Sequence, residues 1–333
     1  MRRVAVFFTG GTISMAVDPA AGGNVPTLDG AAILRRTPGL EAIADVHAVD
    51  LGLTPASHFT LPRLLEIGRA VGEATADPTV DGVVVVQGTD TIEETALCWD
   101  LTQRGATPVV VTGAMRSSSD AGYDGPANLA DAVRCAASPD LRGEGVVVVL
   151  GGTIHAADEV LKTHTSSLTT FQSPNLGPLG WVDGAGVTVL RRRAARRSVE
   201  AARAIEPIYL LTATVGMDGA LLDAAVAVGA RGIVVAATGA GNTTPELLAA
   251  GRRAMEAGIP VVLVSRAPAG RASTGYAFPG GGATWVKAGA LLAGSLSGPK
   301  ARIVLALGLG AGLDRQGLAA LLADPAVAPV PHG

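Results

Sequence analysis

Short runs of valine and other apolar residues alternate with longer amphipathic segments, and this alternation limits the fold more than any other feature. The N-terminal part of the chain contains four such runs: 4–8, 83–86, 108–112 and 146–150. A run that is apolar at every position is typical of a strand covered on both faces. Helical patterns fill the gaps at 61–76, 91–104 and 125–137. Strand–helix–strand order predicts an α/β fold with a mostly parallel, doubly wound sheet.

The same pattern restarts after residue 205. Strands are expected at 207–213, 232–238 and 260–265. Helices are expected at 218–228, 244–257, 285–296 and 314–323. We therefore predict a larger N-terminal domain at 1–190, a linker at 191–206, and a smaller α/β domain with a parallel sheet at 207–333. The arginines of the linker lack interleaved aromatic residues, so we interpret them as solvated rather than as a nucleic-acid patch.

Composition excludes several classes of protein. A formal net charge of −3 provides no general attraction to nucleic acid or to an anionic membrane. The apolar run at 4–8 is too short for the core of a secretory signal, so we expect a first strand and a cytoplasmic protein. Cys98 and Cys135 are the two cysteines, both in helical patterns, and we expect buried free thiols. The histidines show no zinc spacing, so no metal is expected.

Reactive side chains follow the strands in a consistent way. The first strand leads into Thr12, the second into Thr89 and Asp90, and the fourth is followed shortly by Lys162. Ligands of open α/β sheets bind beyond the carboxyl ends of the strands, so these groups are expected on one rim. Singly, each is more often a turn, a helix cap or a surface residue. Together, a hydroxyl, a second hydroxyl and a lysine base form a relay that suits nucleophilic catalysis, with glycines admitting backbone N–H groups to an oxyanion.

Longer motifs carry a resemblance to a known family. They are TGGTIS (9–14), QGTDTIEETA (87–96), PVVVTGAMR (108–116), DGPANL (124–129) and VLKTHT (160–165). In these motifs and their spacing, the sequence resembles bacterial L-asparaginases over essentially its whole length. The resemblance implies hydrolysis of L-asparagine to L-aspartate and ammonia, without a metal or organic cofactor, by a homotetramer built as a dimer of intimate dimers.

The resemblance also implies roles for individual residues. Thr12 would be the nucleophile that forms an acyl-enzyme, with Thr89 and Lys162 as the second hydroxyl and its base. Asp90 would hold the α-ammonium of the substrate. The remaining expected substrate-binding residues are Gly11, Ser57, His58, Gly88, Ala114 and Asn242. Of these, Ser57 would bind the α-carboxylate, and the Ala114 carbonyl would accept a hydrogen bond from the leaving amide nitrogen. Asn242 would reach the site of a neighbouring subunit.

Four positions depart from the family pattern. Val25 stands where a mobile loop carries a tyrosine, and the loop 272–282 lacks the glutamate that a partner subunit supplies. His58 replaces a common glutamine, and Gln87 a common histidine. We expect Tyr276, in the loop without the acid, to substitute for the missing tyrosine.

Three alternatives stay open. The same mechanism would serve glutamine, a D-amino acid or another small amide, and the departures would also suit a catalytically weak amino-acid-binding paralogue. The amide-hydrolysing subunit of a tRNA-dependent amidotransferase is disfavoured, because such subunits carry an extra N-terminal domain and the first strand is expected at residue 4.

Overall fold

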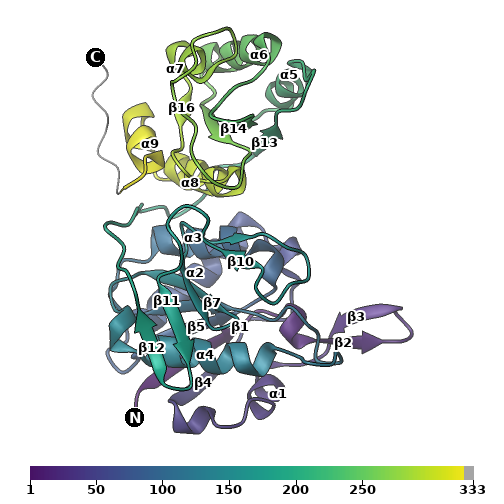
Figure 1. Cartoon of the computed structure of the whole chain (residues 1–333), viewed down its shortest axis with the longest axis vertical. Coiled ribbons are helices and arrows are strands. Elements are labelled where there is room, and N and C mark those ends of the chain that lie inside the picture. The colour runs from purple at the N-terminus through teal and green to yellow at the C-terminus, as the bar shows by residue number, and fades with distance from the viewer. Residues whose placement is uncertain (326–333) are drawn as a thin grey trace. The chain divides into compact units, whose positions relative to one another are not determined.

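The computed structural model describes residues 1–325, which divide into two compact units, Met1–Arg193 and the chain from Ala194 onward (Figure 1). The first unit is built on an eight-stranded sheet with the order β12-β11-β8-β7-β6-β5-β1-β4. Its strands are β1 (Arg3–Phe8), β4 (Asp45–Asp50), β5 (Gly82–Val86), β6 (Val109–Thr112), β7 (Val146–Leu150), β8 (Thr153–Ala156), β11 (Gly180–Asp183) and β12 (Gly186–Val189). The five strands from β7 to β4 run parallel, whereas β8, β11 and β12 extend the sheet in antiparallel fashion.

Helices cover the central strands. They are α1 (Gly30–Arg35), α2 (Leu61–Ala76), α3 (Ile92–Thr102) and α4 (Gly125–Ala137). Helix α4 packs Leu129 and Ala132 into one core with Val84 and Val110 of the sheet. Helix α2 begins at a Thr60 cap, whose side chain accepts from the backbone N–H of Arg63. Every residue of β5 and β7 is buried, which confirms that continuous apolar runs form the centre of the sheet.

Short elements complete the first unit. Two small hairpins pair β2 (Met15–Asp18) with β3 (Gly23–Pro26), and β9 (Leu161–Lys162) with β10 (Phe171–Gln172). Five 3-10 turns are η1 (Thr12–Ser14), η2 (Leu40–Ala42), η3 (Ala56–His58), η4 (Thr89–Thr91) and η5 (Pro139–Leu141). The turns η1, η3 and η4 contain five of the residues that the sequence nominates for chemistry: Thr12, Ser57, His58, Thr89 and Asp90.

The second unit contains a four-stranded parallel sheet with the order β13-β14-β15-β16. Its strands are β13 (Ile208–Thr212), β14 (Gly232–Ala237), β15 (Val261–Ser265) and β16 (Leu291–Leu292). Its helices are α5 (Ala220–Ala227), α6 (Pro245–Glu256), α7 (Gly282–Ala288), α8 (Gly298–Gly310) and α9 (Arg315–Leu322). The predicted α/β class is confirmed in both units.

The second unit also departs from the sequence prediction. The single helix expected at 285–296 is wrong, because α7 ends at Ala288. The next residue, Gly289, caps the helix with a left-handed φ of 113°, and the chain then enters β16. Helix α8 was not predicted. Its residues 303–308 are all buried, so no polar face produces a helical period in the sequence.

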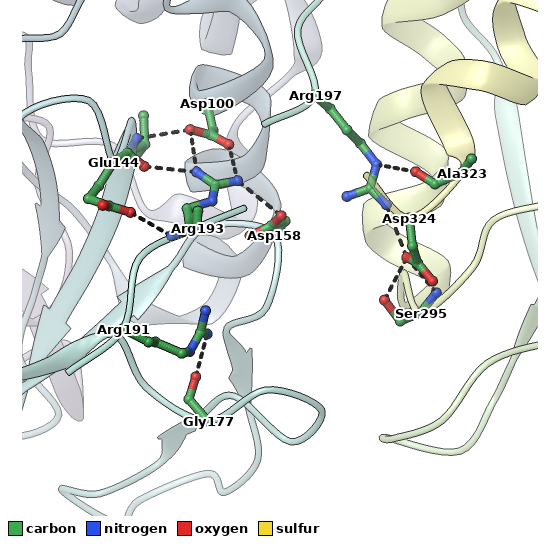
Figure 2. A network of polar contacts seen from close by, with 11 residues as sticks. Asp100, Glu144, Asp158, Gly177, Arg191, Arg193, Arg197, Ser295, Ala323 and Asp324 are labelled. Atoms are coloured by element: carbon green, nitrogen blue, oxygen red, sulfur yellow. Dashed lines mark hydrogen bonds and ion pairs between the residues drawn. The ribbon is translucent and has the colours of Figure 1, made fainter. Parts of the chain in front are cut away.

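Arginines of the connecting segment are anchored by buried ion pairs (Figure 2). Arg193 donates from Nη1 and Nη2 to the two Asp100 carboxylate oxygens at 3.0 and 2.8 Å, and its Nη2 lies 3.0 Å from Asp158. Burial by itself would lower the pKa of Arg193, but the two aspartates outweigh it and raise that pKa. Arg197, in the second unit, donates to the Ala323 carbonyl and to Asp324. Both side chains are 5% exposed, and therefore these two arginines differ from the solvated residues expected there.

Cys98 and Cys135 are free and buried, as predicted. Burial raises the pKa of the Cys98 thiol to about 12 and raises that of Cys135 as well, so both remain protonated at neutral pH. Among residues 1–325, no helix is both long and apolar enough to cross a membrane.

The burial of Arg193 predicts a large loss of stability on its removal. We expect Arg193→Met to lower the free energy of unfolding by roughly 3–5 kcal/mol, because Asp100 and Asp158 lose their cation while they stay buried. The matched control is Arg253→Met, which removes an equally bidentate pair with Asp223 from an arginine that is 57% exposed. The midpoint of urea denaturation should fall strongly for Arg193→Met and little for Arg253→Met. Equal shifts of the two midpoints would contradict a stabilising role for the buried ion pairs of Arg193.

Candidate active site

The site is built where the parallel strands β1, β5 and β6 end. The next residues along the chain are Thr9–Thr12 after β1, Gln87–Thr91 after β5 and Gly113–Met115 after β6. Neighbouring parallel strands end at one edge, so these three turns share it. This confirms that the strand ends carrying Thr12, Thr89 and Ala114 lie on one rim.

Glycines let the three turns touch. Gly11 has a φ of 93°, and a Cβ at this position would lie 2.2 Å from the backbone nitrogen of Gly88. A Cβ on Gly113 would lie 2.5 Å from the Gln87 carbonyl oxygen and 3.1 Å from the Thr89 methyl group. A side chain at Gly11 would therefore push the turn of Thr12 away from the turn of Thr89, and one at Gly113 would push the turn of Ala114 away from the turn of Thr89.

Lys162 enters the same region from the hairpin of β9 and β10. Its Nζ donates to the Thr89 hydroxyl at 2.8 Å and to the Asp90 carboxylate at 2.6 Å. Its backbone N–H donates to Glu93 in the first turn of α3, at 3.1 Å. The lysine side chain is 15% exposed, whereas that of Asp90 is 75% exposed and open to a ligand. The structure thus brings together three of the four predicted catalytic residues in direct contact.

Thr12 begins the turn η1 and is half-buried. Within the described residues, no hydrogen bond engages the Thr12 hydroxyl, which is thereby available to a substrate. The hairpin of β2 and β3 follows directly, and it holds Val25 in register with Ala16. The predicted lid position of Val25 is therefore part of an ordered ribbon, with an alkyl side chain and no proton to exchange.

Ser57 and His58 lie on the turn η3, beside η4. A Cβ on Gly88 would lie 2.9 Å from the Ala56 methyl group, and the Thr91 hydroxyl donates to the Ala56 carbonyl at 3.4 Å. Ser57 and His58 follow Ala56 and are both exposed. The turn that carries the predicted pair therefore packs against the turn that carries Asp90, although the two belong to different segments of the chain.

An unpredicted polar network supports the ends of β6 and β7. The Asp124 carboxylate accepts from the backbone N–H of Met115 at 3.0 Å and from that of Arg116 at 2.9 Å. The Asn128 side chain donates to the Gly113 carbonyl at 3.0 Å and accepts from the Gly151 N–H at 3.1 Å. The motif DGPANL was the sequence signal for this network, since it combines two short polar side chains at a helical spacing of four.

Gln87 is wholly buried beneath the site. Its amide nitrogen donates to the Thr95 hydroxyl at 2.7 Å and more weakly to the Gly88 carbonyl at 3.4 Å. Its amide oxygen has no partner in the described part of the chain. The residue that departs from the family pattern thus ties the turn after β5 to helix α3.

Asn242 and Tyr276 belong to the second unit. Asn242 follows β14, and its backbone carbonyl accepts from the Thr238 N–H and hydroxyl. Tyr276 is half exposed, and its ring packs against Phe278 with centroids 5.7 Å apart. Their expected roles at the catalytic site stay predictions.

The arrangement suits nucleophilic attack on an acyl group. Two hydroxyls from adjacent strand ends, a lysine bonded to one of them and an exposed carboxylate are the parts of a threonine acyl-transfer site. Within residues 1–325, no group of three or more histidine, cysteine, aspartate or glutamate side chains is placed to hold a metal ion.

Known proteins match both units. Residues 3–195 match the family described as "Asparaginase, N-terminal", and residues 207–322 match "Glutaminase/Asparaginase C-terminal domain". The "Probable L-asparaginase" of Deinococcus radiodurans is 36% identical over 321 residues, which cover 94% of this chain and 95% of that protein. The "Glutaminase-asparaginase" of Pseudomonas fluorescens is 30% identical over 281 residues, which cover 81% of this chain and 77% of that protein.

A solved structure agrees with these matches. The probable cytoplasmic L-asparaginase of Campylobacter jejuni superposes with a TM-score of 0.87 at 28% identity, covering 97% of this chain and 99% of that one. The chain therefore matches these two L-asparaginases over nearly the full length of each. The same chain carries the strand-end turns and the contact between Lys162 and Thr89. The chain belongs to the asparaginase family and is an L-asparaginase-like amidohydrolase.

Proposed function

We propose that this protein hydrolyses the side-chain amide of L-asparagine to L-aspartate and ammonia through an acyl-enzyme on Thr12. The observation that carries the proposal is the position of the Lys162 side-chain nitrogen, which is hydrogen-bonded to both the Thr89 hydroxyl and the Asp90 carboxylate. A base beside one hydroxyl and a carboxylate open to solvent give the site separate parts for proton transfer and for binding.

The chemistry follows from these parts. The Thr12 oxygen attacks the amide carbon while its proton passes toward the Thr89–Lys162 pair, in which Lys162 is the base. The carbonyl oxygen gains negative charge, and the backbone N–H groups of Gly11 and Gly88 are the available donors. The C–N bond breaks as nitrogen takes a proton and leaves as ammonia, near the Ala114 carbonyl. Water then attacks the ester, releases aspartate and returns the proton to Thr12.

Substrate recognition is assigned to the exposed rim. Asp90 provides the charge that attracts the α-ammonium of an amino acid, and Ser57 provides a hydroxyl for the α-carboxylate. His58 stands next to Ser57 and, when neutral, can accept one hydrogen bond. Asn242 and Tyr276 would complete the site from another subunit.

Glutamine is the second candidate substrate. One relative is named a glutaminase-asparaginase, and its matched region covers 81% of this chain. The extra methylene of glutamine must fit between Thr12 and Asp90.

We further propose a homotetramer, arranged as a dimer of intimate dimers, that acts in the cytoplasm. The Campylobacter jejuni protein is described as probably cytoplasmic, although a relative at 31% identity from Haemophilus influenzae is named periplasmic. Analytical ultracentrifugation should give a mass near four times 33.3 kDa. A mass of one chain would contradict the assembly, and recovery in a periplasmic fraction would contradict the location.

A panel of amides tests the substrate. We expect ammonia release from L-asparagine with the highest kcat/KM, and slower release from L-glutamine and D-asparagine. Preference for another amide by tenfold or more, about 1.4 kcal/mol in transition-state stabilisation, would overturn the substrate while leaving the mechanism. Binding of aspartate by calorimetry without ammonia release from any amide would instead favour a binding protein.

Substitution tests the mechanism. We expect Thr12→Ala to lower kcat by a factor of about 10³ or more, and Lys162→Met by roughly 10²–10⁴, because one removes the nucleophile and the other its base. Thr79→Ala is the matched control, since Thr79 is an exposed threonine near the opposite end of β5. Mass spectrometry of quenched turnover should find the acyl group on the peptide that contains Thr12. Full turnover by Thr12→Ala would rule out this nucleophile.

A further inference from the structure

The backbone around Thr12 is held by hydrogen bonds to successive carbonyls. The Gly11 carbonyl accepts from the N–H and the hydroxyl of Ser14, at 2.9 and 2.7 Å. The Thr12 carbonyl accepts from the Met15 N–H. These bonds lie within the turn itself, so they cannot fix its direction relative to the rest of the sheet.

External bonds hold the base of the following hairpin. The Ser14 carbonyl accepts from the N–H groups of Thr27 and Leu28, at 2.8 and 2.9 Å. The Met15 carbonyl accepts from the N–H and the hydroxyl of Ser118, at 2.9 and 2.8 Å. The loop at 116–123, which precedes α4, therefore supports the start of the hairpin.

Tyr123 supplies the bond nearest to Thr12 from that loop. Its hydroxyl donates to the carbonyl of Ile13, the residue directly after Thr12, at 2.7 Å across 110 positions of sequence. Ile13 is fully buried, so its carbonyl depends on a protein donor rather than on bulk water.

The tyrosine ring is itself held firmly. It packs against the core of the first unit, and a Cβ on Gly125 would lie 2.4 Å from the ring carbon that bears the hydroxyl. The next residue, Asp124, is fixed by its bonds to Met115 and Arg116. Burial raises the pKa of Tyr123 to about 12, so the hydroxyl keeps the proton that it donates throughout the neutral range.

We propose that Tyr123 is a positioning residue for Thr12, and that its hydrogen bond to the Ile13 carbonyl aims the Thr12 hydroxyl at the substrate. This inference rests on the proposed function of Thr12. Tyr123 would act through the backbone and without proton transfer, so its part differs from the one proposed for Tyr276. A displacement of about 1 Å at a reacting atom is enough to slow a reaction by about two orders of magnitude.

The test is Tyr123→Phe, which removes one oxygen and keeps the ring. We expect kcat for L-asparagine to fall about ten- to a hundredfold, with KM within about twofold, because Asp90 and Ser57 lie on other segments. If Tyr123 only stabilised the fold, its removal would lower the melting temperature and the fraction of folded, active enzyme. The kinetic assays are therefore run well below the melting temperature of the variant. Tyr209→Phe, a half-buried tyrosine of β13, is the control and should keep both constants.

A second readout does not depend on turnover. Hydrogen exchange of the peptide spanning 12–18 should become at least about tenfold faster in Tyr123→Phe, with the peptides of β5 and β6 unchanged. Unchanged exchange would overturn the proposal whatever the activity, and faster exchange with wild-type kcat would overturn the catalytic role. If Thr12→Ala retained full turnover, the proposed nucleophile would fail and the positioning role of Tyr123 with it. An inactive Thr12→Ala beside a Tyr123→Phe variant with wild-type kcat would overturn the positioning role alone.

Discussion

A methyl group on Gly11 would lie 2.2 Å from the Gly88 nitrogen, and one on Gly113 would strike the Gln87 carbonyl, so the ends of β1, β5 and β6 are in backbone contact. This contact determines how near the hydroxyls of Thr12 and Thr89 can come. Lys162 and the turn that carries Ser57 then approach the same edge from outside, through a short hairpin and a 3-10 turn. The reactive groups therefore depend on glycines at the strand ends, because any side chain there would separate the turns.

Much of the fold was predictable because the central strands are buried on both faces. A strand such as β7 has no polar position, so its bounds at 146–150 coincide with the apolar run. The bounds of α2 and α4 also match the helical pattern. Strand β4 was missed, because most of its residues are exposed at the edge of the sheet and it carries no apolar run. Helix α8 was missed for the opposite reason, since burial on all sides removes its period.

The candidate site was predictable to the extent that it follows strand ends. Lys162 and Thr89 are 73 positions apart, yet the strand-end rule and the motifs together placed both on one rim, and the structure shows their contact. Tyr123 was not predictable in this way. Its bond to Ile13 depends on the path of the loop at 116–123, and a lone tyrosine there has no pattern that distinguishes it from a surface residue. Arg193 and Arg197 of the connecting segment were misjudged for a similar reason, because their carboxylate partners are far away in sequence.

The packed glycines have a consequence for laboratory evolution of this enzyme. In random libraries that include positions 11, 88 and 113, most variants would have strand ends that are forced apart. Diversity is better placed at Ser57 and His58, which are exposed on the neighbouring turn η3 and take no part in the backbone contact. Substitutions on the exposed rim leave the backbone contact of the strand ends intact, so substrate preference can change there while the Thr89–Lys162 contact stays the same.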